Sequence, residues 1–536
     1  MILTLLTFLP LAALLLMAFL PRQAAPAHRW IALIITLLQV IGAALFLVPA
    51  WLAARAAGAD AFALQEQLPW ILLDLGAWGT LRLDYFLAAD GLSLALTLLT
   101  LLLMPIAVLS SWKVSHRPQA YFMLLMLLDT SLVGVFLAMD FFLFFIFYEL
   151  LLLPMFFLIG LWGGEKREYA ALKFFLYTLA GSVFMLLVMA GLLFSYAAPN
   201  SAGEAPELTL NILTLSQFNI SEPQFAIEGS VFAPGSILLG MDARLLGFVV
   251  LFLAFAIKLP AIPLHTWLPD AHVEAPTAIS VILAGIVLKV GGYGMARLCY
   301  GIFPDAAAQL HFWIAGAGLV SILYGSLVAM GQKDLKRLVA YSSVAHMGYV
   351  MLGLGSLTAA GISGAYFQMI AHGLVSALLF LLVGVLYDRV HDREISHFRG
   401  LWDLMPRYSV VVMLAFFASL GLPGLCMFVP ELLVYTGVLQ SDLPLWLPAL
   451  AVLGILLGAA YYLRTYRQMF FGVFDEGHTS TWRGLLTDLR PREYLMILPL
   501  VALIVVLGLL PGLVLDFLGG DATALADHVK TAITIP

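Results

Sequence analysis

Fourteen long apolar stretches dominate this sequence, and they restrict the fold that the chain can adopt. A helix needs about 20 mainly apolar residues to cross a bilayer. Only 11% of the 536 residues are charged and 62% are hydrophobic, whereas a soluble domain carries about 25% charged residues. We therefore predict an all-α polytopic membrane protein with about fourteen transmembrane helices. The predicted helices span 2–20, 30–53, 84–111, 119–139, 141–163, 169–196, 244–264, 276–300, 309–330, 336–357, 361–387, 408–439, 444–472 and 493–516.

The Lys and Arg residues of the connecting segments predict the orientation. Almost all of them lie in the odd-numbered connections, and the longest even-numbered connection, 198–243, has none. Since positive residues favour the cytoplasmic side, we expect the odd connections in the cytoplasm. Both termini then lie on the non-cytoplasmic side of a bacterial-type inner membrane. The first stretch has no basic start and no small-residue cleavage site, so we expect a retained helix and not a signal peptide. The connection 198–243 carries instead the carboxylates Glu204, Glu207, Glu222, Glu228 and Asp242.

Seven ionisable side chains stand near the middle of predicted helices. Each costs about 2.5–3.5 kcal/mol at the bilayer centre. One such residue is readily explained as a structural pair between two helices. Seven of both signs at similar depth favour a proton or ion pathway. An eighth, Lys173, lies nearer the start of its helix. The seven are Asp129, Glu149, Lys258, Lys289, His346, His372 and Glu431.

Two predicted helices contain helix breakers beside these ionisable residues. A proline removes a helix hydrogen bond, and in a membrane the freed carbonyl groups must be satisfied by protein or by water in a cavity. Interrupted helices at corresponding places in two halves indicate a transport site. Lys258 precedes Pro260 and Pro263 in "FAIKLPAIPLHTWLPDAHVEAP" (255–276), and Glu431 follows Pro423, Gly424 and Pro430 in "SLGLPGLCMFVPELLVY" (419–435).

The positions of these two helices divide the chain into repeats. Helices four to eight (112–308, with the long loop 198–243) and nine to thirteen (309–472) form two blocks of five. The broken helices seven and twelve are the fourth of each block. An odd number of helices per block predicts inverted repeats. Helices one to three occupy 1–111, and 473–536 holds a cytoplasmic loop, helix fourteen and a C-terminal tail.

Four segments closely resemble the M-type subunits (chain 4) of proton-pumping NADH:quinone oxidoreductase, respiratory complex I. The resemblance extends over about residues 84–470, and these motifs are highly specific for that family. The phrase "LPDAHVEAPT" is typical of the M type, where the related N and L types diverge. The segments are "FFIFYELLLLPMFFLIGLWGGEKREYAALKFFLYT" (144–178), "KLPAIPLHTWLPDAHVEAPTAISVILAGIVLKVGGYGMAR" (258–297), "DLKRLVAYSSVAHMGYV" (334–350) and "QMIAHGLVSALLFLLVGVLYDR" (368–389).

The resemblance implies a redox-inactive, antiporter-like translocating subunit without a cofactor of its own. The complex would use NADH, FMN, iron–sulfur clusters and quinone. The implied partners are the antiporter-like L and N subunits and the lipid bilayer, with no nucleic acid. By position, Glu149 matches the ion-pair partner of Lys258, and Lys289 matches the central lysine of helix eight. Glu431 matches the acidic residue of helix twelve, and His346 and His372 match histidines that bridge the central lysine to it.

Some residues depart from the family pattern or allow two interpretations. Met427 and Pro430 stand where the family usually has glycines, so the geometry around Glu431 is open. Asp129 is either an additional relay or a carboxylate bonded to Thr130 or Ser131, and we favour the second. The three remaining polar residues after the first break either take up protons or cap helix eight and organise its loop. These are His265, Asp270 and His272.

Two further function classes remain compatible with the sequence. The first is a subunit of a multi-subunit cation/proton antiporter or of a membrane-bound hydrogenase, which would keep the same lysines and broken helices. The second is a redox-active membrane protein, with His346 and His372 as a haem ligand pair. Cys299 and Cys426 offer neither a metal-ligand spacing nor a disulfide framework.

Overall fold

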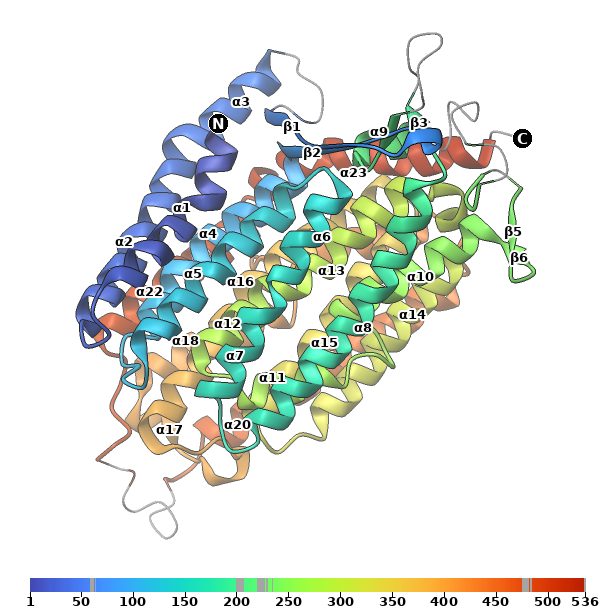
Figure 1. The fold of residues 1–536 in the computed structure, drawn as a ribbon. Coiled ribbons are helices and arrows are strands. Elements are labelled where there is room, and N and C mark those ends of the chain that lie inside the picture. The colour runs from blue at the N-terminus through green and yellow to red at the C-terminus, as the bar shows by residue number, and fades with distance from the viewer. Residues whose placement is uncertain are drawn as a thin grey trace.

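The computed structural model describes residues 1–57, 62, 64–198, 207–218, 227, 230–233, 235–474, 482 and 484–534. Helices running side by side form one elongated bundle (Figure 1). Twelve helices of the described residues are long and apolar enough to cross a membrane. Two further helices are interrupted, so the structure contains all fourteen predicted segments. The carboxylates Glu204, Glu222 and Glu228 lie outside the described residues.

The helices follow the chain in the predicted order. A short helix, α17 (Leu401–Leu404), precedes the second break. The twelve uninterrupted apolar helices of the described residues are α1 (Ile2–Phe19), α2 (Ala25–Gly42) continuing through η1 (Ala43–Leu47) into α3 (Val48–Ala56), α4 (Gly91–Ser110), α5 (Pro118–Leu137), α6 (Phe141–Leu150) with α7 (Leu152–Trp162), α8 (Arg167–Leu193), α12 (Thr277–Ile282) continuing through η4 (Leu283–Val287), α13 (Leu288–Gly294) and η5 (Met295–Tyr300), α14 (Pro304–Met330), α15 (Leu335–Gly355), α16 (Ala359–Val390), α20 (Trp446–Phe470) and α22 (Pro491–Leu509).

The middle of the bundle is made of three elements. The helix from α12 to η5 and α16 are buried along the whole of their apolar spans, and α15 is nearly so. By contrast, α1, α2 and α22 bury only about a third of theirs. The polar residues that the central helices carry are therefore shielded from lipid by the outer helices. An ionisable group here can interact only with neighbouring protein groups or with water inside the bundle.

The two predicted helix breaks are confirmed. The first separates α10 (Ala243–Lys258) from α11 (Trp267–Glu274), and the second separates α18 (Pro406–Ser419) from α19 (Phe428–Leu439). Each interrupted pair is the fourth membrane helix of its block of five. Because successive membrane helices run in opposite directions, helices five places apart are also opposed, as inverted repeats require.

The start of the third predicted helix was wrong. Residues 84–89 belong to the strand β2 (Thr80–Ala89), which pairs antiparallel with β1 (Leu64–Asp74) in a hairpin. The helix α4 begins only at Gly91, because Asp90 and Ser93 form a capping box in which each side chain bonds the other's backbone N–H. The apolar pattern continues from this strand into the helix, so it did not predict where the helix begins.

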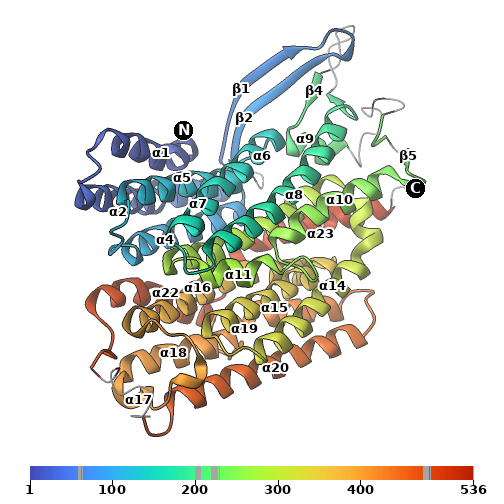
Figure 2. The same cartoon turned by 60° about the horizontal axis from the view of Figure 1, so that its bottom comes forward.

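The C-terminal tail also differs from the prediction. The fourteenth membrane helix ends at Leu509 and not near 516, and Gly512–Thr534 forms a further helix, α23. It crosses the end of the bundle that carries the β1–β2 hairpin and both termini (Figures 1 and 2). The short strands β3 (Ala197–Ala198) and β4 (Glu207–Thr209) extend the hairpin into a sheet of order β1-β2-β4-β3. The short helix α9 (Ile212–Phe218) and the hairpin of β5 (Ile237–Leu238) and β6 (Met241–Asp242) complete this end.

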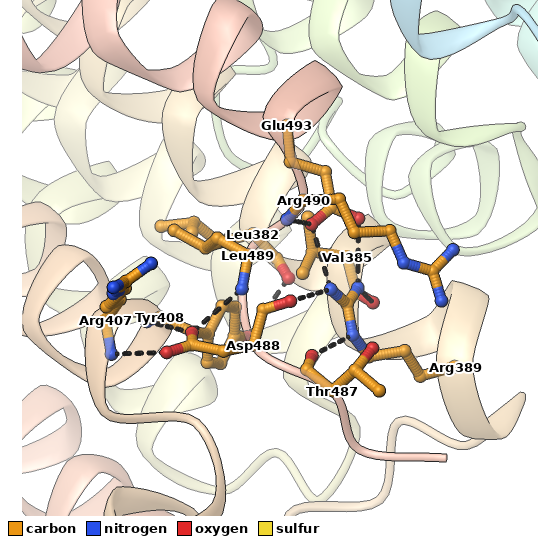
Figure 3. Close-up of polar contacts among 10 residues, drawn as sticks. All are labelled: Leu382, Val385, Arg389, Arg407, Tyr408, Thr487, Asp488, Leu489, Arg490 and Glu493. Atoms are coloured by element: carbon orange, nitrogen blue, oxygen red, sulfur yellow. Dashed lines mark hydrogen bonds and ion pairs between the residues drawn. The ribbon is translucent and has the colours of Figure 1, made fainter.

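At the opposite end, one arginine joins three segments. The buried Arg389, on α16, forms an ion pair with Glu493 at 2.8 Å and donates to the carbonyl groups of Thr487 and Asp488 (Figure 3). The Asp488 carboxylate in turn accepts the backbone N–H of Tyr408 at the start of α18. Negative charge is favourable at a helix N-terminus. The cluster therefore fixes α22 and α18 against the central helix.

Replacement of Arg389 by Ala should destabilise the packing of α22. The substitution leaves Glu493 buried without its partner, which costs about 3–5 kcal/mol. The measurement is the thermal stability of the purified protein and the protease sensitivity of 471–490. Arg407→Ala is the matched control, because the side chain of Arg407 is exposed and only its backbone N–H contacts Asp488. Equal stability of the two variants would contradict the role of the ion pair.

Candidate functional site

Lys258 is fully buried at the end of α10, directly before the first break. Its Nζ has no hydrogen-bond partner among the described residues and lies 4.3 Å from the centre of the Tyr148 ring. A cation over an aromatic face is stabilised by the ring quadrupole. The backbone of the break is satisfied by other groups, since the Trp267 indole donates to Ile257 O and Ile262 N–H donates to Ser321. The break thus holds a buried amine without a fixed partner.

Glu149 lies next in sequence to Tyr148, on α6. Its Oε1 is buried and has no hydrogen-bond partner among the described residues. The groups that act electrostatically on its carboxylate are Ser182 on α8 and Lys258. The structure therefore brings Glu149 and Lys258 into electrostatic range of each other, without a direct salt bridge between them. The sequence had not indicated Tyr148, which lies beside both.

Lys289 is fully buried in α13, just after the π-helical turn η4. Its Nζ donates to the carbonyl group of Ala284 within that turn and lies 2.8 Å from His372 Nδ1. A π-helical turn leaves carbonyl groups outside the regular helix ladder, and such turns are frequent at functional sites. Gly291 lets this helix approach the first break, because a Cβ there would lie 2.5 Å from Leu259 N.

Two histidines continue from Lys289 to the second break. The ring centres of His372, on α16, and His346, on α15, are 5.6 Å apart. His346 Nδ1 lies 3.5 Å from Glu431 Oε1 on α19. All four residues are at most 7% exposed. Lys289, His372, His346 and Glu431 thus form one line of contacts, which we call the buried polar axis.

A chain of hydroxyl groups branches from His346. Its Nε2 lies 3.1 Å from Ser419 Oγ, which lies 2.8 Å from Tyr462 OH, and Tyr462 donates to Ser342 at 3.0 Å. Hydroxyl groups both donate and accept, so they can hold either protonation state of the imidazole. The sequence had given no indication of these residues, because isolated Ser and Tyr residues are common in membrane helices.

The second break explains the two residues that depart from the family pattern. Pro430 lies in the first turn of α19, where backbone N–H groups have no helical partner, so its ring removes no hydrogen bond. Met427 is fully buried directly before that turn. Gly421, with φ +70°, meets Glu431 at the place of its missing side chain, since a Cβ there would lie 2.7 Å from Glu431 Oε2. The breakers Pro423 and Gly424 lie between the two helices.

The preferred interpretation of Asp129 was wrong. Asp129 is fully buried on α5, and neither carboxylate oxygen has a hydrogen-bond partner among the described residues. Ser131 donates to Leu127 O, and the Thr130 hydroxyl is unpaired. The polar neighbour is Gln39 of α2, which donates its amide to Leu6 O. Asp129 lies on α5 near α1 and α2, away from the contacts of the buried polar axis.

The polar residues after the first break divide into two groups. Asp270 forms ion pairs of 2.7 Å with both Lys173 and Arg337, so it ties α8 and α15 to α11. His265 packs edge-on against Tyr324 and is 4% exposed. These contacts organise the loop, as one of the two interpretations of Asp270 requires.

His272 has a different environment. It is fully buried, stacks on Phe380 with ring centres 4.3 Å apart, and both ring nitrogens are unpaired among the described residues. It lies in electrostatic range of Lys289 and of Lys336. Lys336, at the start of α15, is 6% exposed and donates to Ala275 O at 2.6 Å. His272 is therefore within electrostatic range of both Lys336 and Lys289.

These features define an antiporter-like membrane subunit with two broken helices and a buried polar axis between them. A family model described as "NADH:quinone oxidoreductase/Mrp antiporter, TM" matches residues 138–458. The chain is 40% identical to NADH-quinone oxidoreductase subunit M of Rhodobacter capsulatus, over 98% of this chain and 96% of that protein. It is 37% identical to NAD(P)H-quinone oxidoreductase chain 4 2 of Thermosynechococcus vestitus, over 99% and 93%. The chain belongs to this NADH:quinone oxidoreductase/Mrp antiporter family.

Solved structures show the same fold. A chain of respiratory complex I from Thermus thermophilus with bound NADH is similar with a TM-score of 0.78 and 29% identity, over 99% of this chain and 100% of that one. A chain of the membrane-bound sulfane sulfur reductase, an archaeal respiratory complex, gives a TM-score of 0.75 at 22% identity, covering 99% of each. The second likeness concerns the fold alone.

Gly421→Ala should impair the site without unfolding the helix break. A Cβ at 421 would displace the Glu431 carboxylate from His346, so proton translocation should fall severalfold. Gly424→Ala is the matched control, because it also stands at positive φ but its nearest neighbour is a Leu509 methyl group at 3.8 Å. Both variants incur the left-handed backbone cost of about 1–2 kcal/mol. Equal losses of ion translocation by reconstituted protein in both would refute a specific effect on Glu431.

Proposed function

We propose that this chain is a redox-inactive proton-translocating membrane subunit of an NADH:quinone oxidoreductase. It lies in a bacterial-type inner membrane with both termini on the non-cytoplasmic side, beside antiporter-like subunits of the L and N types. Electron transfer in other subunits, which carry NADH, FMN, iron–sulfur clusters and quinone, drives it. The observation that carries the proposal is the buried polar axis, which joins the middle of the bundle to the second helix break. The M-type names of the relatives support the choice of complex.

Protons reach Lys289 from the cytoplasmic side through Lys336 and His272. Among the described residues, His272 has two unpaired ring nitrogens, so it can accept a proton on one and release one from the other. Asp270 and Lys173 hold the loop around this route in place. His265 lines the same loop and is given no transfer step in this scheme.

Along the buried polar axis, one proton moves at each step. Protonated Lys289 gives its proton to His372 Nδ1 through the 2.8 Å contact and becomes a neutral amine. His372 passes a proton to His346, and His346 Nδ1 gives one to Glu431. The Ser419 hydroxyl accepts or donates at His346 Nε2 as the charge of the ring changes. A proton from His272 then restores the charge of Lys289, and Glu431 releases its proton before the next one arrives.

Glu149 controls the proton affinity of Lys258 electrostatically. An ionised carboxylate nearby favours the charged amine, and its withdrawal or protonation favours the neutral one. Lys258 has no fixed hydrogen bond among the described residues, so its charge responds strongly to such a change. Gly291 places the Lys289 helix against the break that follows Lys258, so the two lysines stand on segments in direct contact. Asp129 has no role in this scheme.

A cation/proton antiporter or hydrogenase subunit is the second candidate. The family model itself includes the Mrp antiporters, which favours this alternative. Co-purification separates the two, because the proposed function requires that the chain be recovered with a large NADH-oxidising assembly. A redox-active protein is less compatible with the site, because the two imidazoles use ring nitrogens toward Lys289 and Ser419.

Glu149→Gln should lose most proton pumping, and Glu149→Asp should lose less. Only an ionisable group can change the charge balance at Lys258, and the amide is nearly the same size as the carboxylate. The measurement is NADH-driven proton uptake by membrane vesicles, normalised to assembled complex on native gels. If the Gln and Asp variants behave alike, packing and not charge is what matters at this position.

Glu431→Gln should abolish or strongly reduce pumping, while Pro430→Gly should leave it near normal. The amide cannot accept the proton from His346, whereas a proline in the first turn of α19 contributes no hydrogen bond that a glycine would restore. Both variants are measured in the same vesicle assay. Normal pumping by Glu431→Gln would remove Glu431 from the route, and inactive but assembled Pro430→Gly would show that the proline shapes the break.

A further inference from the structure

A second group of buried charges lies at the end of the bundle that carries α23. There a cavity of about 220 Å³ is lined by residues of α4, η5, α16, α23 and α9. Its charged lining residues are Asp90, Arg297, Asp521 and His528. By the proposed orientation, this end faces the non-cytoplasmic side. None of these residues takes part in the buried polar axis.

Asp90 and Arg297 are fixed by their contacts. One Asp90 oxygen accepts the backbone N–H and the hydroxyl group of Ser93, and the other forms an ion pair with Arg297. Arg297 also lies over the Tyr293 ring, 5.4 Å from its centre. Both carboxylate oxygens of Asp90 therefore have fixed partners.

Asp521 is different, because only one of its oxygens is used. Oδ2 accepts the Leu92 N–H at the start of α4, at 2.8 Å, whereas Oδ1 is buried and has no partner among the described residues. Asp521 is 8% exposed and lines the cavity. The close approach depends on Gly91, since a Cβ there would lie 1.8 Å from Phe517 O of α23. The fold thus inserts one half-satisfied carboxyl group into the cavity.

We propose that Asp521 is the proton-releasing group at the non-cytoplasmic end of this subunit, held beside the Asp90–Arg297 ion pair. The proton resides on the unpartnered Oδ1 and leaves through the cavity, and the carboxylate that remains accepts the next proton from the interior. No other atom is exchanged. The inference rests on the proposed function, because a release group needs protons that arrive through the bundle.

The charges around Asp521 suit this role. The single positive charge of Arg297 is shared with two carboxylates, so one of the two is favoured in its neutral form. Burial raises the pKa of Asp521 to about 7, and the charge of Asp90 adds to this rise. Arg297 and Arg55 act in the opposite direction. The remaining titratable neighbours are Tyr293, Tyr366 and His528, whose Nε2–H donates to Gly301 O.

Two central helices connect this group with the buried polar axis. Lys289 and Arg297 lie on one helix, eight residues or about 12 Å apart, with Tyr293 between them. On α16, Tyr366 lies six residues before His372 and lines the cavity. The Tyr293 hydroxyl donates to Phe136 O. Tyrosine hydroxyl groups from both helices therefore occupy the interval between Lys289 and Asp521.

The test compares Asp521→Asn with Asp527→Asn in the intact complex. Asn keeps the acceptor for Leu92 N–H but cannot hold a transferable proton, whereas Asp527 is an exposed carboxylate on the same helix. Asp521→Asn should lower NADH-driven proton uptake per assembled complex by roughly tenfold or more, as loss of a positioned acid–base group does. Asp527→Asn should remain at the wild-type level. Asp521→Glu, which keeps an ionisable group, should recover part of the activity.

The infrared carboxyl band provides a second measurement. Wild-type complex should show a protonated-carboxyl band that titrates around pH 7 and is lost in Asp521→Asn but not in Asp527→Asn. If Asp521→Asn does not assemble, Asp521→Glu should shift this band, and an unshifted band overturns the inference. Normal pumping by Asp521→Asn together with loss in Glu431→Gln overturns the inference alone. Normal pumping by both variants overturns the proposed function as well.

Discussion

The contact between Lys289 and His372 is the interaction on which the interior of this protein depends. An ammonium group in the middle of a bilayer protein is stable only where acceptors replace its water. Two central helices supply them, one through the π-helical turn that presents Ala284 O and the other through the imidazole. Both helices are buried along their whole apolar spans, so only groups inside the bundle can bond this lysine. The remaining helices surround this contact and separate it from lipid and from bulk water.

Both helix breaks solve the same physical problem in different ways. At the first, an amine is left without a hydrogen bond and is stabilised by the Tyr148 ring, while Trp267 and Ser321 satisfy the backbone. At the second, a carboxylate lies against Gly421 and near His346. The first break is therefore suited to a group whose charge is controlled by a neighbour, and the second to a group that receives a proton. The inverted repeats provide equivalent positions and leave their chemistry free to differ.

Ion pairs hold the helices together at the two ends of the bundle, on either side of the ionisable groups in its interior. Arg389 and Glu493 hold α16, α18 and α22 together at one end, and Asp90 and Arg297 hold α4 against the central helix at the other. Backbone groups also bond Arg389, Glu493 and Asp90, whereas Arg297 Nε has no hydrogen-bond partner among the described residues. By contrast, Lys258 Nζ, Asp521 Oδ1 and His346 Nδ1 are buried without a hydrogen-bond partner among the described residues, and the proposed transfer route uses the last two.

The sequence by itself determined the fourteen apolar segments, the two breaks and the identity of most of the buried ionisable residues, because hydropathy, proline and intramembrane charge are local signals. It failed where a boundary or a partner depends on distant residues. The Asp90 cap separates a strand from a helix inside one apolar run. The helix α23 was predicted as a tail, because it packs on Gly91 of another helix. Asp129 proved to face Gln39 and not its sequence neighbours. Only the tertiary structure decided which charges meet, since contacts such as Lys289–His372 and Asp521–Leu92 join residues 83 and 429 positions apart.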